Sequence, residues 1–292
     1  MISEIYPSVW RASGSLPGPN IFLIGGTHGN ERTGIEVIRV LRDRLRGGSL
    51  SLEKGTLTLA VGNVKAAEEN VRYFDGRDLN RCFNLDRLAA PPDGTYEDAR
   101  ARELSVLIRE ADVTLDLHAT NKPSVPFAAS KRDAAHERVY RWFATEIVLT
   151  DPHYILGGEP ATTDEYADAV GKIGICVETG QASDVSVLPR VLQALDGLLR
   201  DFELIAGPVP EPPPEPTSVY VLDQAIILTS KGFHFANGMG THSFQSVKVG
   251  DIIGYVGEET LTAKKNGVIL FPKTPEYQTE GKPVVYLASQ MD

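Results

Sequence analysis

Strand-like and helix-like segments alternate along the first two-thirds of this sequence, and that order leaves few folds open. The continuous apolar run IFLI at residues 21–24 is typical of a strand that is buried on both faces. Residues 34–45 then place apolar side chains at helical spacing, and residues 55–63 again have the pattern of a strand. Strands that alternate with helices predict a mostly parallel or mixed α/β sheet with helices on both faces.

The same alternation continues, and it brings chemically useful side chains to the ends of strands. The further segments are predicted helices at 101–111, 136–148 and 185–204, and predicted strands at 112–120 and 172–180. In sheets of this kind, ligands bind beyond the carboxyl ends of the strands. His28, His118 and Glu178 each lie at the end of a predicted strand. We therefore expect one pocket to hold all three.

The composition changes sharply near residue 208. The segment PVPEPPPEP at 208–216 cannot form a helix or an interior strand, and it is typical of a semi-rigid linker. Short strand patterns separated by glycine turns follow it. We therefore predict an α/β domain at 1–207, the linker at 208–216 and a smaller all-β domain at 217–292.

The charge and the cysteines limit the partners and the compartment. The formal net charge is −10 and the sequence pI is near 5.2, which argues against nucleic acid and anionic membranes as partners. Cys82 and Cys176 lie far apart and are expected to be free thiols rather than a disulfide. The N-terminus lacks the pattern of a signal peptide, and no apolar run is long enough to span a bilayer. We expect a cytoplasmic protein, and a homo-oligomer stays open.

A histidine and a carboxylate follow the first predicted strand in the segment GGTHGNE. His28 and Glu31 are three residues apart, so both can point at one metal ion, although a glutamate in the first turn of a helix explains HGNE equally well. The segment DLHAT supplies His118 as a third ligand, and three protein ligands are typical of catalytic zinc. Asp116 shares a strand face with His118, where it could orient the imidazole or merely lie nearby.

Four motifs occur in order: GGTHGNERTG, RDLNRCF, DLHAT and VETG. Together they resemble the aspartoacylase and succinylglutamate desuccinylase family of zinc amidohydrolases, relatives of the zinc carboxypeptidases, over about residues 20–205. The resemblance implies a zinc carboxypeptidase-like fold. It also implies that His28, Glu31 and His118 bind one Zn²⁺ per chain and that Glu178 is the general base and acid.

The segment VRYFDGRDLNRCF gives this acidic chain a local positive charge, and arginine binds carboxylates through two parallel hydrogen bonds. By the resemblance, Asn80 and Arg81 hold the α-carboxylate of the substrate, and Arg72 stabilises the tetrahedral oxyanion. This chain has one more residue between Arg72 and Asp78 than the animal aspartoacylases, so Arg77 is the alternative for the oxyanion.

Two further positions concern the rest of the substrate. Tyr277 resembles a tyrosine of the β domain that reaches the substrate in aspartoacylases, and this similarity implies a β domain that caps the cleft. Asp164 stands where those enzymes have an arginine that binds a second substrate carboxylate. An acid there would oppose such binding. Either this loop is built differently or the substrate lacks that carboxylate.

These features predict a zinc-dependent hydrolase that cleaves the amide of a small anionic N-acyl amino acid, similar to N-acetylaspartate or N-succinylglutamate. The alternative is a zinc metallocarboxypeptidase that acts on short peptides or cell-wall fragments, although a capping β domain argues against a long open cleft. A carrier role for the β domain is disfavoured because Lys264 and Lys265 precede a strand instead of lying at a hairpin tip. A non-catalytic binding protein is disfavoured because every ligand and base position is filled.

Overall fold

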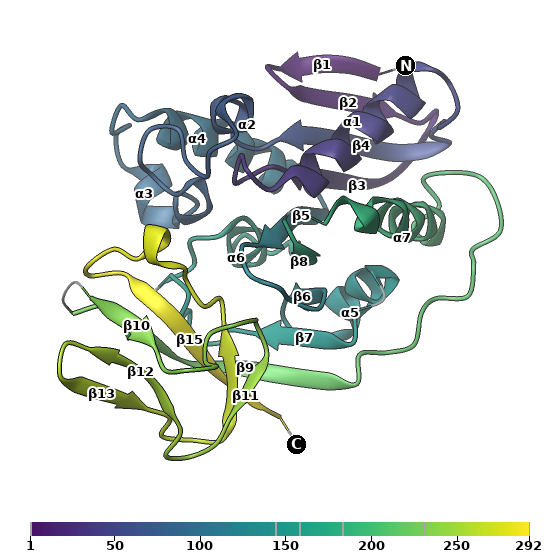
Figure 1. Cartoon of the computed structure of the whole chain (residues 1–292). Helices are drawn as coiled ribbons and strands as arrows, with labels where there is room; N and C mark the ends of the chain where they lie inside the picture. The colour runs from purple at the N-terminus through teal and green to yellow at the C-terminus, as the bar shows by residue number, and fades with distance from the viewer. Residues whose placement is uncertain (1, 144, 158, 183, 230–231, 292) are drawn as a thin grey trace.

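The computed structural model describes residues 2–143, 145–157, 159–182, 184–229 and 232–291. Most of its strands belong to one large sheet (Figure 1). They are, in chain order, β1 (Ile2–Tyr6), β2 (Val9–Ser13), β3 (Leu16–Gly25), β4 (Lys54–Val61), β5 (Val113–Thr120), β6 (Phe127–Ala129), β7 (Ile147–Thr150), β8 (Ile173–Gln181), β9 (Ser218–Ile227), β11 (Gln245–Val247), β14 (Gly267–Leu270) and β15 (Pro283–Gln290). The spatial order is β1-β2-β4-β3-β5-β8-β6-β7-β9-β15-β14-β11.

The helices and the remaining strands connect or flank this sheet. The helices are α1 (Arg32–Arg46), α2 (Val64–Glu69), α3 (Leu85–Ala89), α4 (Tyr96–Glu110), α5 (Ala134–Tyr140), α6 (Thr163–Ala169) and α7 (Leu188–Asp201), with the 3-10 turns η1 (Leu79–Arg81), η2 (Arg141–Phe143), η3 (Val185–Val187) and η4 (Pro275–Tyr277). A separate three-stranded sheet holds β10 (Phe233–Phe235), β12 (Ile252–Val256) and β13 (Glu259–Thr262).

The predicted α/β sheet with helices on both faces is confirmed. Strands β4, β3, β5 and β8 are parallel neighbours at its centre. Alternate residues of β3 face opposite sides: Leu23 packs in one buried cluster with α1 and α7, and Phe22 packs in another with α4 and α6. This alternation explains why the apolar run of β3 is continuous, since neither face meets water.

The predicted helix at 136–148 is wrong at its C-terminal end. Helix α5 ends at Tyr140, the η2 turn follows, and residues 147–150 form strand β7. β7 pairs in parallel with β6 and with β9. The apolar, β-branched sequence IVLT favours this strand, and pairing on both sides outweighs the helical spacing of its apolar residues.

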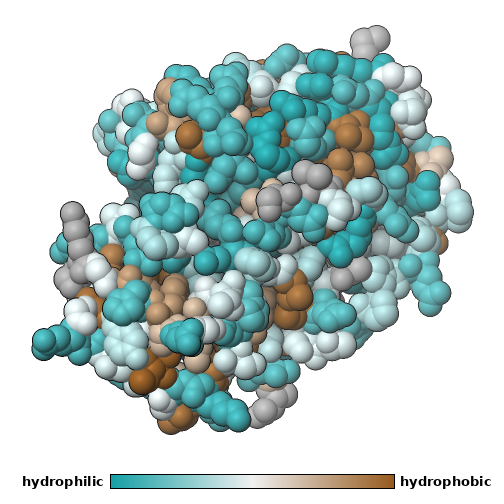
Figure 2. Space-filling view, viewed as in Figure 1, coloured by the Kyte–Doolittle hydropathy of each residue, from teal (hydrophilic) through white to brown (hydrophobic). Residues whose placement is uncertain are grey.

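The C-terminal region extends the large sheet. After the proline-rich segment, β9 pairs in parallel with β7 and antiparallel with β15, so the hydrogen-bonded ladder continues across the predicted boundary. The small sheet packs with β15 in its own apolar cluster, which includes Phe233, Ile253 and Val285. The division at 208–216 stays a prediction. Figure 2 shows hydrophobic residues over the C-terminal strands at the lower left, with a further group at the upper right.

Two expectations from the sequence concern the cysteines and membrane-spanning segments. Cys82 and Cys176 are both buried and free. Across the ranges given above, no helix is long and apolar enough to cross a membrane.

A buried histidine joins α5 to α6. His136 lies 2.8 Å from a carboxylate oxygen of Asp133 through Nδ1 and 2.8 Å from Asp168 through Nε2. Burial lowers the pKa of His136, but hydrogen bonds to Asp168 and Asp133 outweigh it and raise the pKa above 6.5. Because the folded pKa is raised, this pair of contacts stabilises the fold fully below pH ~6.5, and the stabilisation is lost as the pH rises through the folded value.

We therefore expect His136→Ala to lower the free energy of unfolding by about 1–3 kcal/mol at pH 6 and by less at pH 9. Urea unfolding at the two pH values measures this difference. The exposed His153 provides a control, since His153→Ala should change neither value. An equal loss at both pH values would show that packing, not charge, gives His136 its effect.

Candidate active site

A close approach of α1 to β3 positions the first two site residues. A Cβ atom on Gly25 would lie 2.3 Å from the carbonyl oxygen of Gly34, so the end of β3 and the start of α1 can meet only because Gly25 has no side chain. The tight connection holds His28 and Glu31, and Glu31 immediately precedes α1. In β5, the parallel neighbour of β3, His118 lies near the carboxyl end of the strand.

His28, Glu31 and His118 converge on one another. Nδ1 of His28 lies 2.7 Å from one Glu31 oxygen, and Nδ1 of His118 lies 3.1 Å from the other. One ligand atom from each residue lies within 4.8 Å of the others, and all three residues are buried. Tetrahedral zinc with bonds of ~2 Å requires ligand atoms only ~3.3 Å apart, so small side-chain adjustments suffice. The donor set of two imidazoles and a carboxylate therefore fits a metal ion.

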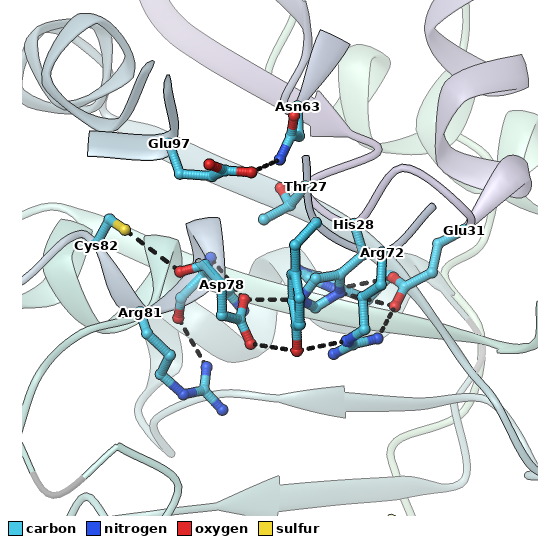
Figure 3. Close-up of polar contacts among 12 residues, drawn as sticks. Thr27, His28, Glu31, Asn63, Arg72, Asp78, Arg81, Cys82 and Glu97 are labelled. Atoms are coloured by element: carbon cyan, nitrogen blue, oxygen red, sulfur yellow. Dashed lines mark hydrogen bonds and ion pairs between the residues drawn. The ribbon is translucent and has the colours of Figure 1, made fainter. Parts of the chain in front are cut away.

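Two aspartates contact the far sides of the imidazoles. A carboxylate oxygen of Asp78 lies 3.0 Å from Nε2 of His28 (Figure 3), and one of Asp116 lies 3.0 Å from Nε2 of His118. Asp116 is itself held by a hydrogen bond of 2.7 Å from the hydroxyl of Thr163. Such partners orient metal-binding imidazoles and leave Nδ1 free for the ion. The sequence left the role of Asp116 open and did not indicate that Asp78 contacts the site.

The carboxylate of Glu31 stays ionised at the centre of this cluster. Burial alone would raise the pKa of Glu31, but the charges of His28 and His118 and their hydrogen bonds hold it well below the usual range. The backbone N–H of Ala119 also donates to Glu31 over 3.0 Å. A permanently charged carboxylate is the form that binds a metal cation.

Arg72, not Arg77, contacts the metal-ligand cluster. Nη1 of Arg72 donates to Glu31 over 2.9 Å (Figure 3), whereas Arg77 pairs with Asp93 at 3.0 Å. The side chain of Tyr73 fixes the arginine further, because its hydroxyl accepts a hydrogen bond of 2.9 Å from Nε of Arg72. This geometry favours Arg72 for the oxyanion, and the role itself stays a prediction.

Glu178 lies beside the cluster, in the strand next to that of His118. It is the register neighbour of His118 in the adjacent strand, and it is 8% exposed. Burial raises the pKa of Glu178 to about 7, while the charge of His118 opposes the rise and that of Glu31 adds to it. Within the described residues, Oε2 makes no hydrogen bond. A buried acceptor without a partner costs free energy, and a water or a substrate N–H would satisfy it.

The predicted carboxylate-binding residues line the same cleft. Asn80 accepts a hydrogen bond of 3.1 Å from the backbone N–H of Thr163, which fixes its amide, and Arg81 donates to the Asn80 carbonyl over 2.7 Å. Asn80, Arg81 and Tyr277 all belong to the wall of one cleft with the metal-ligand cluster, and the cleft has a volume of about 1590 Å³.

The C-terminal region contributes cleft residues that the sequence did not reveal. Lys273 and Tyr286 belong to the wall together with Tyr277. Burial lowers the pKa of Lys273, and the positive charge of Arg72 lowers it further. Lys273 stands four residues before Tyr277 in the segment FPKTPEY, so the motif that carried the tyrosine was a usable signal. The lysine adds a cation to the side of the cleft that holds the arginines.

The comparisons with known proteins agree with this geometry. A family profile described as the succinylglutamate desuccinylase/aspartoacylase catalytic domain matches residues 17–199. The chain belongs to this family. Members of the family are N-acyl amino acid amidohydrolases. The expected resemblance is thereby confirmed.

Several curated relatives are similar over part or most of the chain. An N-acyl-aromatic-L-amino acid amidohydrolase of Mus musculus is 32% identical over 57% of this chain and 56% of its own length. An N-alpha-acetyl-L-2,4-diaminobutyric acid deacetylase of Halomonas elongata is 30% identical over 67% of this chain and 58% of its own. A succinylglutamate desuccinylase of Vibrio vulnificus is 26% identical over 93% and 80%. The chain thus spans little more than half the length of the first two.

Solved structures share the fold over nearly the whole chain. A succinylglutamate desuccinylase from Vibrio parahaemolyticus superposes with a TM-score of 0.78 at 21% identity, over 98% of this chain and 86% of the other. Murine aminoacylase 3 superposes with a TM-score of 0.72 at 22% identity, over 94% and 96%. Both matches therefore include the C-terminal strands.

Proposed function

We propose that this protein is a zinc-dependent hydrolase that cleaves the amide bond of an N-acyl amino acid and releases a carboxylate and a free amino acid. The observation that supports this proposal is the convergence of His28, Glu31 and His118 beside Glu178, whose Oε2 has no hydrogen-bond partner in the part of the chain that the structure describes. A zinc ion held by these three ligands would supply a Lewis acid that polarises the acyl carbonyl and makes water more acidic.

Glu178 moves the proton in this proposal. Its carboxylate accepts a proton from the water that attacks the acyl carbon, and the resulting carboxylic acid then gives that proton to the leaving nitrogen. Burial raises the pKa of Glu178 to about 7, which suits a group that must both accept and donate near neutral pH. The C–N bond breaks only after the nitrogen is protonated. The proton that Glu178 accepts from water is the one that it gives to this nitrogen, so one residue serves both steps.

The arginines bind charge that the substrate carries or develops. Arg72 donates to the oxyanion that forms at the acyl carbonyl oxygen, since its guanidinium already lies against the metal-ligand cluster. Asn80 and Arg81 hold the α-carboxylate of the amino acid. Lys273 adds positive charge to this wall. The proposed substrate is therefore a small molecule with a free α-carboxylate.

A metallocarboxypeptidase remains the second candidate because of the size of the cleft. A volume of about 1590 Å³ exceeds the ~300–1,000 Å³ of most small-molecule sites. Tyr277 and Tyr286 of the C-terminal region nevertheless form part of its wall, which favours a small substrate. Hydrolysis of N-acetyl amino acids compared with short peptides and cell-wall fragments separates the two candidates.

Replacing Arg81 tests the assignment of the α-carboxylate. We expect Arg81→Ala to lower kcat/KM by about 10- to 100-fold for substrates with a free α-carboxylate, since a hydrogen bond to a charged group contributes about 1.5–3 kcal/mol. The same substrates with an amidated carboxyl group should lose little. Arg77→Ala is the matched control from the same segment, because Arg77 pairs with Asp93 instead. An equal loss on free and amidated substrates would contradict the assignment.

A further inference from the structure

The start of α6 forms part of the cleft wall. A Cβ atom on Gly174 would lie 2.0 Å from the carbonyl oxygen of Asp164, so the first turn of α6 packs against bare backbone of β8. Thr163, its first residue, donates through the backbone to the side chain of Asn80 and through the hydroxyl to Asp116. Both partners belong to the site described above. The position of Asp164 is therefore set by the same residues that build the catalytic centre.

Asp164 and Glu178, the proposed base, both belong to the wall of the cleft. Gly174, Cys176 and Glu178 alternate along β8 and so share one face of the strand, with ~6.6 Å between successive members. Since α6 packs on Gly174, Cys176 is the residue of this strand face that lies between Asp164 and Glu178. Asp164, Cys176 and Glu178 all belong to the wall of the cleft. Two such spacings, about 13 Å along the strand, separate Gly174 from Glu178, and Cys176 lies between them.

The neighbouring acids of α6 are occupied. Glu165 accepts hydrogen bonds from the backbone N–H groups of Ala161 and Thr162. Asp168 pairs with His136 at 2.8 Å. Among the residues that the structure describes, no cationic side chain lies within 4.0 Å of the carboxylate of Asp164.

The electrostatics of Asp164 favour a cationic partner. Burial raises the pKa of Asp164 to about 7, and the charge of Glu165 adds to the rise, against a hydrogen bond from Thr162. An ionised carboxylate in this place is costly until a positive charge lies beside it. A second carboxylate would increase that cost.

We propose that Asp164 makes this enzyme select N-acyl amino acids whose side chain ends in an amine or a guanidinium group. This inference rests on the proposed function and defines its substrate class. The two ends of the amino acid then meet opposite charges: Arg81 binds the α-carboxylate, and Asp164 binds the side-chain cation. Substrates with a side-chain carboxylate, such as N-acetylaspartate, are disfavoured by the same acid.

Two measurements test this selection. The first is the affinity of the zinc-loaded protein for free L-ornithine, L-lysine, L-aspartate and L-glutamate by calorimetry, which needs no turnover. The second is kcat/KM for the Nα-acetyl derivatives of the same amino acids. We expect the basic amino acids to bind at least about tenfold more tightly and their derivatives to be cleaved at least about tenfold faster, as one charge-assisted contact gives.

Substitutions of Asp164 test whether its carboxylate causes the preference for basic amino acids. Asp164→Asn should abolish the preference, and Asp164→Arg should reverse it. Glu276→Gln, which removes an exposed carboxylate elsewhere on the cleft wall, should leave the preference unchanged.

The outcomes separate the inference from the proposed function. Tighter binding of the acidic amino acids, or a preference that survives Asp164→Asn, overturns the inference. Hydrolysis of any derivative upholds the proposed function in either case. A basic preference in binding that Asp164→Asn removes, without hydrolysis of any derivative, supports the inference about the site and refutes the hydrolase.

Discussion

Glu178→Gln should lower kcat for N-acyl amino acids by about 10²- to 10⁴-fold while the bound metal remains. Gln has nearly the same shape as Glu, but its amide cannot accept and return a proton. The site around it should persist, since Oε2 of Glu178 makes no hydrogen bond within the described part of the chain. Steady-state kinetics and metal analysis on the same preparations measure the two effects.

Stability provides an independent readout for this variant. The folded pKa of Glu178 is raised to about 7, so in metal-free protein its carboxylate costs stability as the pH rises above the unfolded value of ~4.3. The neutral amide removes that cost. Metal-free Glu178→Gln should therefore melt at the same temperature as the parent, or higher, at pH 8, and the difference should shrink toward pH 5.

Glu276→Gln is the control for Glu178→Gln, and one result would contradict the proposed role of Glu178. Glu276→Gln removes an exposed cleft carboxylate and should leave kcat within about twofold. A Glu178→Gln protein that retains its metal and turns over at the parent rate would remove Glu178 from the chemistry. The zinc ligands would then have to act with another base.

The sequence predicted the parts of the fold that follow from local pattern. The run at 21–24 could be recognised as a buried strand because it is continuous and apolar, and the motif at 112–120 because Val113, Leu115 and Leu117 alternate along it before its polar end. β7 was missed because its four residues continue the helical spacing of α5, and only pairing with β6 and β9 makes them a strand. A sequence pattern carries no direct information on such partners.

In the candidate site, too, local sequence pattern predicted some residues, and only tertiary structure shows the others. The spacing within HGNE and the position of DLHAT at a strand end allowed His28, Glu31 and His118 to share one ion, and the resemblance to the family favoured that interpretation over an ordinary helix start. The contact of Asp78 with His28 depends on a turn 50 residues away from the histidine, and the place of Lys273 depends on the docking of the C-terminal strands. These contacts arise from tertiary structure. A motif can therefore predict the metal ligands but not the distant residues that contact them or line the cleft.

Glu31→Gln should nearly abolish metal binding, with less than about one-tenth of an ion per chain after purification in zinc. Glu31 bridges the two imidazoles, and its oxygens also accept hydrogen bonds from Ala119 and Arg72. The amide of Gln would place an N–H group against donors and lose the negative charge that attracts the ion. Hydrolysis should fall by at least about 10²-fold. Metal analysis with zinc, cobalt and manganese measures occupancy and identifies the preferred ion.

Thermal melting shows whether the metal binds at this cluster in the folded chain. A ligand that binds only the folded state stabilises it by about 4 kcal/mol at a thousand times its Kd, so added zinc should raise the melting temperature of the chelator-treated parent. The same addition should leave Glu31→Gln unchanged, because its site no longer holds the ion. His153→Ala, which removes an exposed imidazole, should behave like the parent. If Glu31→Gln still bound one ion per chain and gained the same stability, the ion would lie elsewhere, and a hydrolytic mechanism built on His28, Glu31 and His118 would fail with it.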